Sequence, residues 1–168
     1  GLAAALALTA GAGPARSHGA SEASSALSLL PVAVVVAAPA AVLSAALSGP
    51  MAGGEWYESL ARPALQPPGP VFGIAWTILY TLLGIAASRL WLAPASPARS
   101  RALTLFLVQL ALNLAWSPLF FAGQQLLEAL VLLGAILLLS VAATVAAARV
   151  DRPSPWLMLP YLVWLSFA

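Results

Sequence analysis

Long, almost uncharged apolar runs decide what this chain can fold into. The hydrocarbon core of a bilayer is about 30 Å thick, so a helix that rises about 1.5 Å per residue needs about 20 apolar residues to cross it. Four such runs fit the sequence and part of a fifth follows them, at about 29–47, 71–93, 102–122, 126–148 and 153–168. The runs are rich in Leu and Ala and do not alternate, which disfavours strands. The sequence therefore predicts an all-α membrane protein, a bundle of five transmembrane helices.

The composition supports a membrane environment and excludes other classes. Of 168 residues, 62% are hydrophobic and 7% are charged, and the mean hydropathy is +0.96. A soluble domain of this size needs far more charge to cover its core. The seven basic residues are all arginine and the net charge is +2, which is too little to neutralise a phosphate backbone. The lipid bilayer is therefore an expected partner, and nucleic acid is not.

The two ends of the sequence fall outside the complete spans. Residues 1–28 are rich in Ala, Ser and Gly, and we interpret them as a low-complexity leader, with the remnant of a targeting sequence as the alternative. The fifth apolar run stops at Ala168 before it is long enough to cross, so we expect the fifth helix to be truncated there. Residues 29–168 are predicted to form one transmembrane domain.

Arginine placement tests the number of spans, because loops on the cytosolic side of a membrane collect positive charge. If the five spans alternate in direction, Arg62 alone falls opposite the N-terminus. The arginines on the N-terminal side are Arg16, Arg89, Arg99, Arg101, Arg149 and Arg152. Chance placement is the alternative. The bias predicts a multi-pass protein with its N-terminus on the cytosol-like side, and it leaves open which membrane holds the chain.

A polar, proline-rich loop joins the first two spans on the charge-poor side. It carries Glu55, Trp56, Tyr57 and Glu58, followed by Pro63, Pro67, Pro68 and Pro70. Prolines fix φ and remove amide donors, so the loop cannot be helical throughout, and we predict an ordered, partly extended lid. Trp56 and Tyr57 fit equally well as interfacial residues at the level of the lipid headgroups.

Polar and aromatic side chains share one face in each of three spans. The third span carries Gln109, Asn113, Trp116, Ser117 and Phe120, the second Phe72, Trp76, Tyr80 and Leu83, and the fifth Tyr161, Trp164 and Ala168. Amide and hydroxyl groups are costly in hydrocarbon unless paired, so these faces should line the bundle interior or a cavity. Each stripe alone is typical of packing or of interhelical hydrogen bonds. The three together predict a pocket for a flat apolar ligand.

The sequence offers no evident machinery for acid–base or metal chemistry. The one histidine, His18, lies in the leader, there is no cysteine, and no pair of acids lies within a span. We interpret Glu128, near the start of the fourth span, as an interfacial charge rather than a proton relay. We therefore expect no catalytic residue, no metal site and no required cofactor.

Small residues in the fourth span favour close helix contact. They are Gly134, Ala135, Ser140, Ala142 and Ala143. Such residues let helices approach closely, which predicts a homodimer, or alternatively packing within one chain.

Three motifs resemble those of one known family. They are EWYxxLxxPxxxPPxxxFxxxW from Glu55 to Trp76, QLALNLAWSPLFF from Gln109 to Phe121, and PYLVW from Pro160 to Trp164. Over residues 31–168 the chain resembles the translocator proteins, also called tryptophan-rich sensory proteins or peripheral-type benzodiazepine receptors. The resemblance implies a bundle of five helices. It also implies binding of porphyrins such as protoporphyrin IX and haem, of sterols including cholesterol, and of synthetic benzodiazepine or isoquinoline ligands.

The resemblance also implies which residues line the pocket. They are Trp56 in the lid, Phe72 and Trp76 in the second span, Asn113, Trp116 and Phe120 in the third, and Trp164 and Ala168 in the fifth. Leu65 and Pro70 stand where many members have aromatic residues, a departure that would loosen porphyrin stacking. The proposed cholesterol motif of animal members would lie beyond Ala168.

The function that the resemblance implies is that of a membrane receptor or transporter-like protein. It would serve porphyrin homeostasis and the stress response and would not be an enzyme. A light-dependent porphyrin-degrading enzyme and a structural scaffold without a ligand are the alternatives.

Overall fold

The computed structural model describes residues 54–61 and 66–167. Its elements are α3 (Glu55–Ser59), α4 (Gly69–Leu92), α5 (Pro97–Ser117), the π-helical turn η1 (Pro118–Ala122), α6 (Leu126–Ala148) and α7 (Ser154–Phe167). Within these residues all regular structure is helical, as predicted. The leader 1–28, the first span 29–47, Arg16, His18, Arg62, Leu65 and Ala168 lie outside the described residues, so the division of the chain at residue 28 stays a prediction.

Three of the described helical segments are long and apolar enough to cross a membrane: Gly69–Leu92, Pro97–Ala122 and Leu126–Ala148. The predicted fourth span coincides with α6, and the second differs from α4 by one or two residues at each end. The third begins at Pro97 rather than at 102, because Ser96 caps the helix. Its Oγ accepts a hydrogen bond from the Arg99 amide at 3.2 Å, and proline is favoured in a first helical turn.

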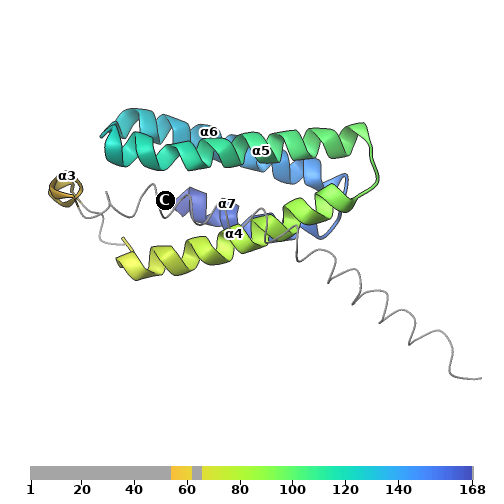
Figure 1. Cartoon of the computed structure of the whole chain (residues 1–168), viewed down its shortest axis with the longest axis horizontal. Helices are drawn as coiled ribbons and strands as arrows, with labels where there is room; N and C mark the ends of the chain where they lie inside the picture. The colour runs from red at the N-terminus through yellow and green to blue at the C-terminus, as the bar shows by residue number, and fades with distance from the viewer. Residues whose placement is uncertain (1–53, 62–65, 168) are drawn as a thin grey trace, which may run out of the picture.

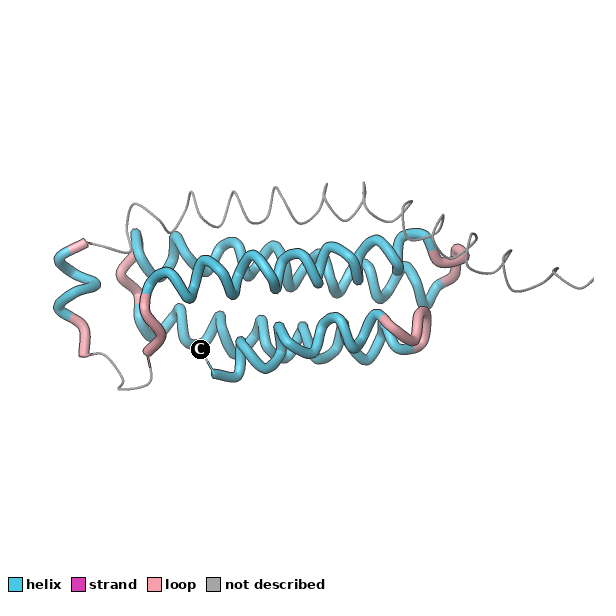
Figure 2. The backbone as a smooth tube through the Cα atoms, turned by 90° about the horizontal axis from the view of Figure 1, so that it is seen from below, coloured by secondary structure: helices cyan, strands magenta, loops and turns pink. Residues whose placement is uncertain are grey.

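The four long helices run along one common axis (Figures 1 and 2). α5 and α6 form an antiparallel pair, and α7 packs against both α4 and α6. The largest fully buried apolar side chains are Leu83 and Leu90 of α4, Phe106 of α5, Ile136 of α6, and Met158 and Tyr161 of α7. Large apolar side chains such as Leu130, Leu138 and Val163 are exposed on the outside. Exposed apolar surface of this extent suits a bundle whose solvent is lipid.

Charged residues of the described chain gather at the two ends of the bundle. The C-terminus of α4, the N-terminus of α5 and the α6–α7 turn meet at one end (Figure 1). This arginine end, residues 89–101 and 149–154, carries Arg89, Arg99, Arg101, Arg149 and Arg152. The aromatic end, residues 54–61, 66–76, 116–129 and 161–167, carries Glu55, Glu58 and Glu128. The five arginines that the structure describes thus share one end, as the predicted topology requires.

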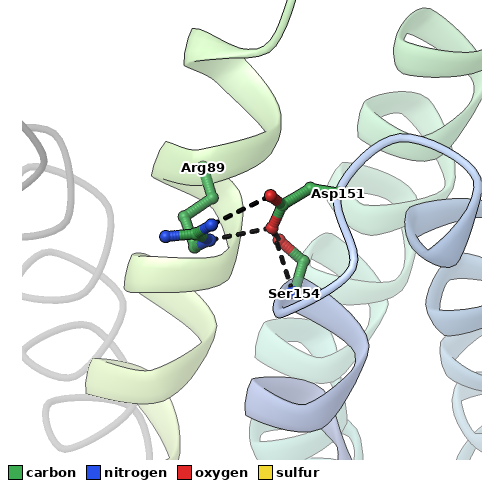
Figure 3. A network of polar contacts seen from close by, with 3 residues as sticks. All are labelled: Arg89, Asp151 and Ser154. Atoms are coloured by element: carbon green, nitrogen blue, oxygen red, sulfur yellow. Dashed lines mark hydrogen bonds and ion pairs between the residues drawn. The ribbon is translucent and has the colours of Figure 1, made fainter. Parts of the chain in front are cut away.

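A polar clasp ties the helices together at the arginine end (Figure 3). Arg89 donates from Nε and Nη2 to the two carboxylate oxygens of Asp151, at 2.8 and 2.9 Å. Asp151 also accepts from the backbone amide of Ser154 at 3.0 Å and from its hydroxyl. The hydrogen bond from Arg89 is the main cause that lowers the pKa of Asp151 below its ordinary value of 3.8, and the bonds from Ser154 add to it. The clasp, Arg89, Asp151 and Ser154, fixes the start of α7 against α4.

Candidate functional site

Five aromatic rings meet where α4 packs on α7. Trp76 stacks on Tyr80, with ring centroids 5.2 Å apart, and meets Tyr161 and Trp164 edge to face at 6.3 and 6.4 Å. Phe72 meets Trp164 edge to face at 5.7 Å. We call Phe72, Trp76, Tyr80, Tyr161 and Trp164 the inner cluster. The four-residue spacing along α4 puts its three rings on one helix face, so the structure brings the predicted Phe72, Trp76 and Trp164 together.

A second group of rings joins α3 to the end of α5. Trp116 stacks on Phe120 with centroids 4.7 Å apart and ring planes 10° apart. Trp56 meets Phe120 edge to face at 5.5 Å, and Tyr57 meets Phe121 at the same distance. We call Trp56, Tyr57, Trp116, Phe120 and Phe121 the lid cluster. All five rings are half-buried. α3 therefore contacts the bundle directly through these rings.

The π-helical turn η1 aims two rings of the lid cluster at α3. The Gly123 amide donates to the Pro118 carbonyl at 2.9 Å, the wide spacing of a π turn. A Cβ on Gly123 would lie 2.6 Å from the Leu119 carbonyl oxygen, so this position has no room for a side chain. Phe120 and Phe121 stand perpendicular, with centroids 4.9 Å apart. The turn was not predicted from the sequence, although Pro118 and Gly123, five residues apart, mark an irregular helix end.

Asn113 links the helix of the lid cluster to the inner cluster. Its Nδ2 donates to the Tyr80 hydroxyl at 2.9 Å, and Asn113 lies one turn before Trp116 on α5. The Trp116 indole N–H donates to the Ala129 carbonyl at 3.0 Å, so this donor is hydrogen-bonded to α6. The predicted site residues thus fall into two groups of rings on neighbouring helices, with Asn113 between them.

A buried polar network lies deeper along the same face of α5. Gln109 Oε1 accepts hydrogen bonds from the Ser140 hydroxyl at 3.1 Å and from the Tyr161 hydroxyl at 2.9 Å. Gln109, Asn113 and Ser117 are buried, so the predicted stripe does face the interior. These contacts confirm interhelical hydrogen bonding for the polar part of the stripe. Gln109 Nε2 is buried without a hydrogen-bond partner in the described part of the chain.

Several members of the two clusters are absent from the predicted site. Tyr80 and Tyr161 belong to the predicted aromatic stripes, and Tyr57 and Phe121 are sequence neighbours of the predicted Trp56 and Phe120. Two hollows formed by described residues, one on the outer surface of α6 and one at the arginine end, have no ring of either cluster in their lining. The rings of each cluster contact one another directly, at centroid distances between 4.7 and 6.4 Å.

Comparison with known proteins places these features in one family. The model of the TspO/MBR family matches residues 29–168. Protein CrtK of Rhodobacter capsulatus is 38% identical over 117 residues, which cover 68% of this chain and 72% of that protein. The tryptophan-rich sensory protein of Cereibacter sphaeroides is 38% identical over 115 residues, 68% of this chain and 70% of that protein.

A mammalian relative matches equally well. The translocator protein of Homo sapiens is 38% identical over 117 residues, which cover 68% of this chain and 69% of that protein. These matches confirm the family resemblance seen in the three motifs. Since the family match runs from the first predicted span to the last residue, this chain belongs to the TspO/MBR family of helical, multi-pass membrane proteins.

Proposed function

We propose that this protein is a membrane receptor or transporter-like protein that binds a tetrapyrrole, such as protoporphyrin IX or haem, at its aromatic end. The observation that carries the proposal is the pair of ring clusters on helices joined by the Asn113–Tyr80 hydrogen bond. A tetrapyrrole is flat and largely apolar, and each aromatic ring that stacks on it contributes about 0.5–1.5 kcal/mol beyond the burial of area. Relatives named translocator and sensory proteins support a role in moving or sensing such a ligand.

Ligand entry would part α3 from the rings of α5 and η1. Trp56 and Tyr57 reach the bundle through edge-to-face ring contacts, each worth about 0.5–1.5 kcal/mol beyond the burial of area. The clasp at the other end holds α4 to α7 through charged hydrogen bonds. The ligand would then stack on Trp76 and Trp164, and burial of its apolar area would supply most of the affinity, at about 25 cal/mol per Å².

Asn113 would supply the polar orientation that ring stacking lacks. Its amide is buried at the boundary of the two clusters, and its Nδ2 can exchange the Tyr80 hydroxyl for a polar group of the ligand. A sterol is the second ligand class, because it also presents a flat apolar face. We propose binding rather than acid–base or nucleophilic catalysis, because the residues of the two clusters and Asn113 carry no carboxylate, imidazole or thiol. We also propose a role in porphyrin homeostasis and the stress response, which the family resemblance implies.

A homodimer is a further part of the proposal. The small residues of α6 divide between buried and exposed positions: Ser140 and Ala143 are buried within the chain, whereas Gly134 is exposed. The exposed Gly134 leaves room for a second copy. Crosslinking in native membranes should capture a dimer, and capture of monomer alone would contradict it.

Titration with protoporphyrin IX tests the function. The full chain in lipid nanodiscs should give a saturable shift of the porphyrin absorption band and quenching of tryptophan fluorescence. Unchanged spectra would contradict the proposal and favour a scaffold, and bleaching that grows with time under light would favour an enzyme. Trp91→Phe is the matched control, because Trp91 is an exposed tryptophan at the arginine end and its loss should leave the titration unchanged. Competition by cholesterol decides whether sterols share the site.

A further inference from the structure

We propose that a groove between the start of α5 and the end of α6 binds an anionic phospholipid of the surrounding bilayer. The groove has a volume of about 430 Å³ and is lined by Arg101 and Arg149 together with small or apolar residues, among them Ala98, Ala142 and Ala146. It lies at the arginine end, away from both ring clusters. The proposal is therefore independent of the tetrapyrrole site.

Among the described residues, no acid forms an ion pair with either arginine of the groove. Among the described residues the arginine end holds one acid, Asp151, and both of its carboxylate oxygens accept from Arg89. Arg99 at the same end lies over the Trp91 ring, 5.5 Å from its centroid. Arg101 and Arg149 thus bring two guanidinium groups to one groove without a carboxylate of the described chain to balance them. A bound phosphate would balance them and accept bidentate hydrogen bonds from guanidinium groups.

The position of the groove favours a lipid over a free phosphate. Arg101 lies in the second turn of α5 and Arg149 directly follows α6, so both lie at the level where spanning helices leave the hydrocarbon. Ala142, Val145 and Ala146 continue the lining along α6 toward the middle of the bilayer. Their small or short side chains leave space for an acyl chain, while the arginines meet the headgroup. Basic sites between helices on the cytosolic side are suited to anionic lipid headgroups.

Native mass spectrometry of the full chain, with added phosphatidylglycerol or phosphatidylcholine, tests this site. We expect phosphatidylglycerol to be retained and phosphatidylcholine to be lost. Arg101→Gln and Arg149→Gln should each weaken the retention about fivefold, the effect of one arginine near a charged surface. Arg152→Gln is the matched control, since it removes the same charge from the same end but does not line the groove. It should leave the retention unchanged.

Ala146→Phe tests the apolar part of the groove without changing any charge. It should displace the lipid while both arginines remain, and it keeps the proposal testable should an arginine variant fail to fold. Equal losses in Arg152→Gln would reduce the site to a diffuse surface charge and overturn the proposal. Equal retention of the two lipids would overturn it as well, because the arginines would then not select an anionic headgroup. Glycerol phosphate binding as tightly as the whole lipid would also overturn it, in favour of a free phosphate. So would a dimer that Ala146→Phe dissociates with no loss of lipid, because the groove would then be an interface between copies.

Discussion

The two ends of the bundle are held by different kinds of contact. At the arginine end, two charged hydrogen bonds of 2.8 and 2.9 Å join Arg89 to Asp151, and Asp151 caps the start of α7. At the aromatic end, α3 meets η1 through half-buried rings with centroids 5.5 Å apart. Bidentate charged pairs add geometric specificity, whereas aromatic pairs are favourable over a range of centroid distances of about 4.5–7 Å. The comparison leads us to expect that the arginine end resists opening more than the aromatic end, where we propose that the ligand enters.

The two ends also differ in charge. The arginine end carries five arginines and Asp151, and the aromatic end carries three glutamates in the described part of the chain. Loops with an excess of arginine stay on the cytosolic side during insertion. The charges therefore orient the bundle, and the aromatic end is expected to face away from the cytosol.

Labelling of single cysteines at the two ends tests this orientation. The chain has no cysteine, so Ser59→Cys in α3 and Ser100→Cys in the first turn of α5 each introduce a single thiol. Both positions are exposed. In intact membranes an impermeant maleimide should label the two variants from opposite sides. Reaction of both from one side would contradict the alternating spans and the comparison of the two ends.

Removal of the clasp should give the largest loss of stability. Asp151→Ala breaks the ion pair with Arg89 and removes the cap of α7, and we expect the free energy of unfolding to fall by about 2 kcal/mol. Detergent-induced unfolding followed by circular dichroism measures it. Arg152→Ala, next in the chain and exposed, should have almost no effect. An equal loss in both variants would show that the clasp is not what holds this end.

Acid should weaken the clasp in the unchanged protein. The pKa of Asp151 is lowered in the folded state, so its contribution to stability is complete above the ordinary value of 3.8 and is lost as the pH falls through the folded value. The difference in the free energy of unfolding between the unchanged protein and Asp151→Ala should therefore become smaller below about pH 4. A difference that stays constant down to lower pH would exclude the carboxylate as the cause.

The sequence predicted the helices well because the signal for a membrane span is local. A run of apolar residues can be recognised without knowledge of the rest of the chain. The run that ends at Ala148 was found in this way, and α6 begins and ends where predicted. The start of α5 was missed because its first two turns contain Arg99 and Arg101, and the prediction counted only the uninterrupted apolar run. A polar helical turn outside the hydrocarbon is invisible to such a search.

Partners across the bundle could not be predicted in this way. Helical spacing placed Asn113 on an inward face, but not the Tyr80 hydroxyl that it binds, 33 residues away. Arg89 and Asp151 are 62 residues apart in the sequence, and their contact depends on the position of α7 along the axis of α4. The candidate site was therefore predicted as a set of helix faces, and its division into an inner cluster and a lid cluster required the structure.

Trp76 should matter most to the ligand at the aromatic end. Trp76→Ala removes one stacked ring and its apolar area from the inner cluster, and we expect affinity for protoporphyrin IX to fall about tenfold. Fluorescence and absorption titrations in nanodiscs measure the change. Trp76→Phe should recover part of the affinity, because it keeps a ring. A loss of thermal stability with unchanged affinity would mean that Trp76 serves helix packing alone.

The loss of Trp56 should have the smallest effect on affinity and should act on rates. Trp56 reaches Phe120 from α3, outside the inner cluster, so Trp56→Ala leaves the stacking surface of Trp76 in place. A weakened lid lets a ligand enter and leave faster, so we expect the dissociation rate to rise about threefold while the dissociation constant changes less. Stopped-flow displacement of protoporphyrin IX by an excess of haem measures the rate. Trp91→Ala, at the arginine end, is the control. If Trp56→Ala instead lowered affinity as much as Trp76→Ala with an unchanged dissociation rate, the lid cluster would be part of the pocket wall and the aromatic end would be as fixed as the arginine end.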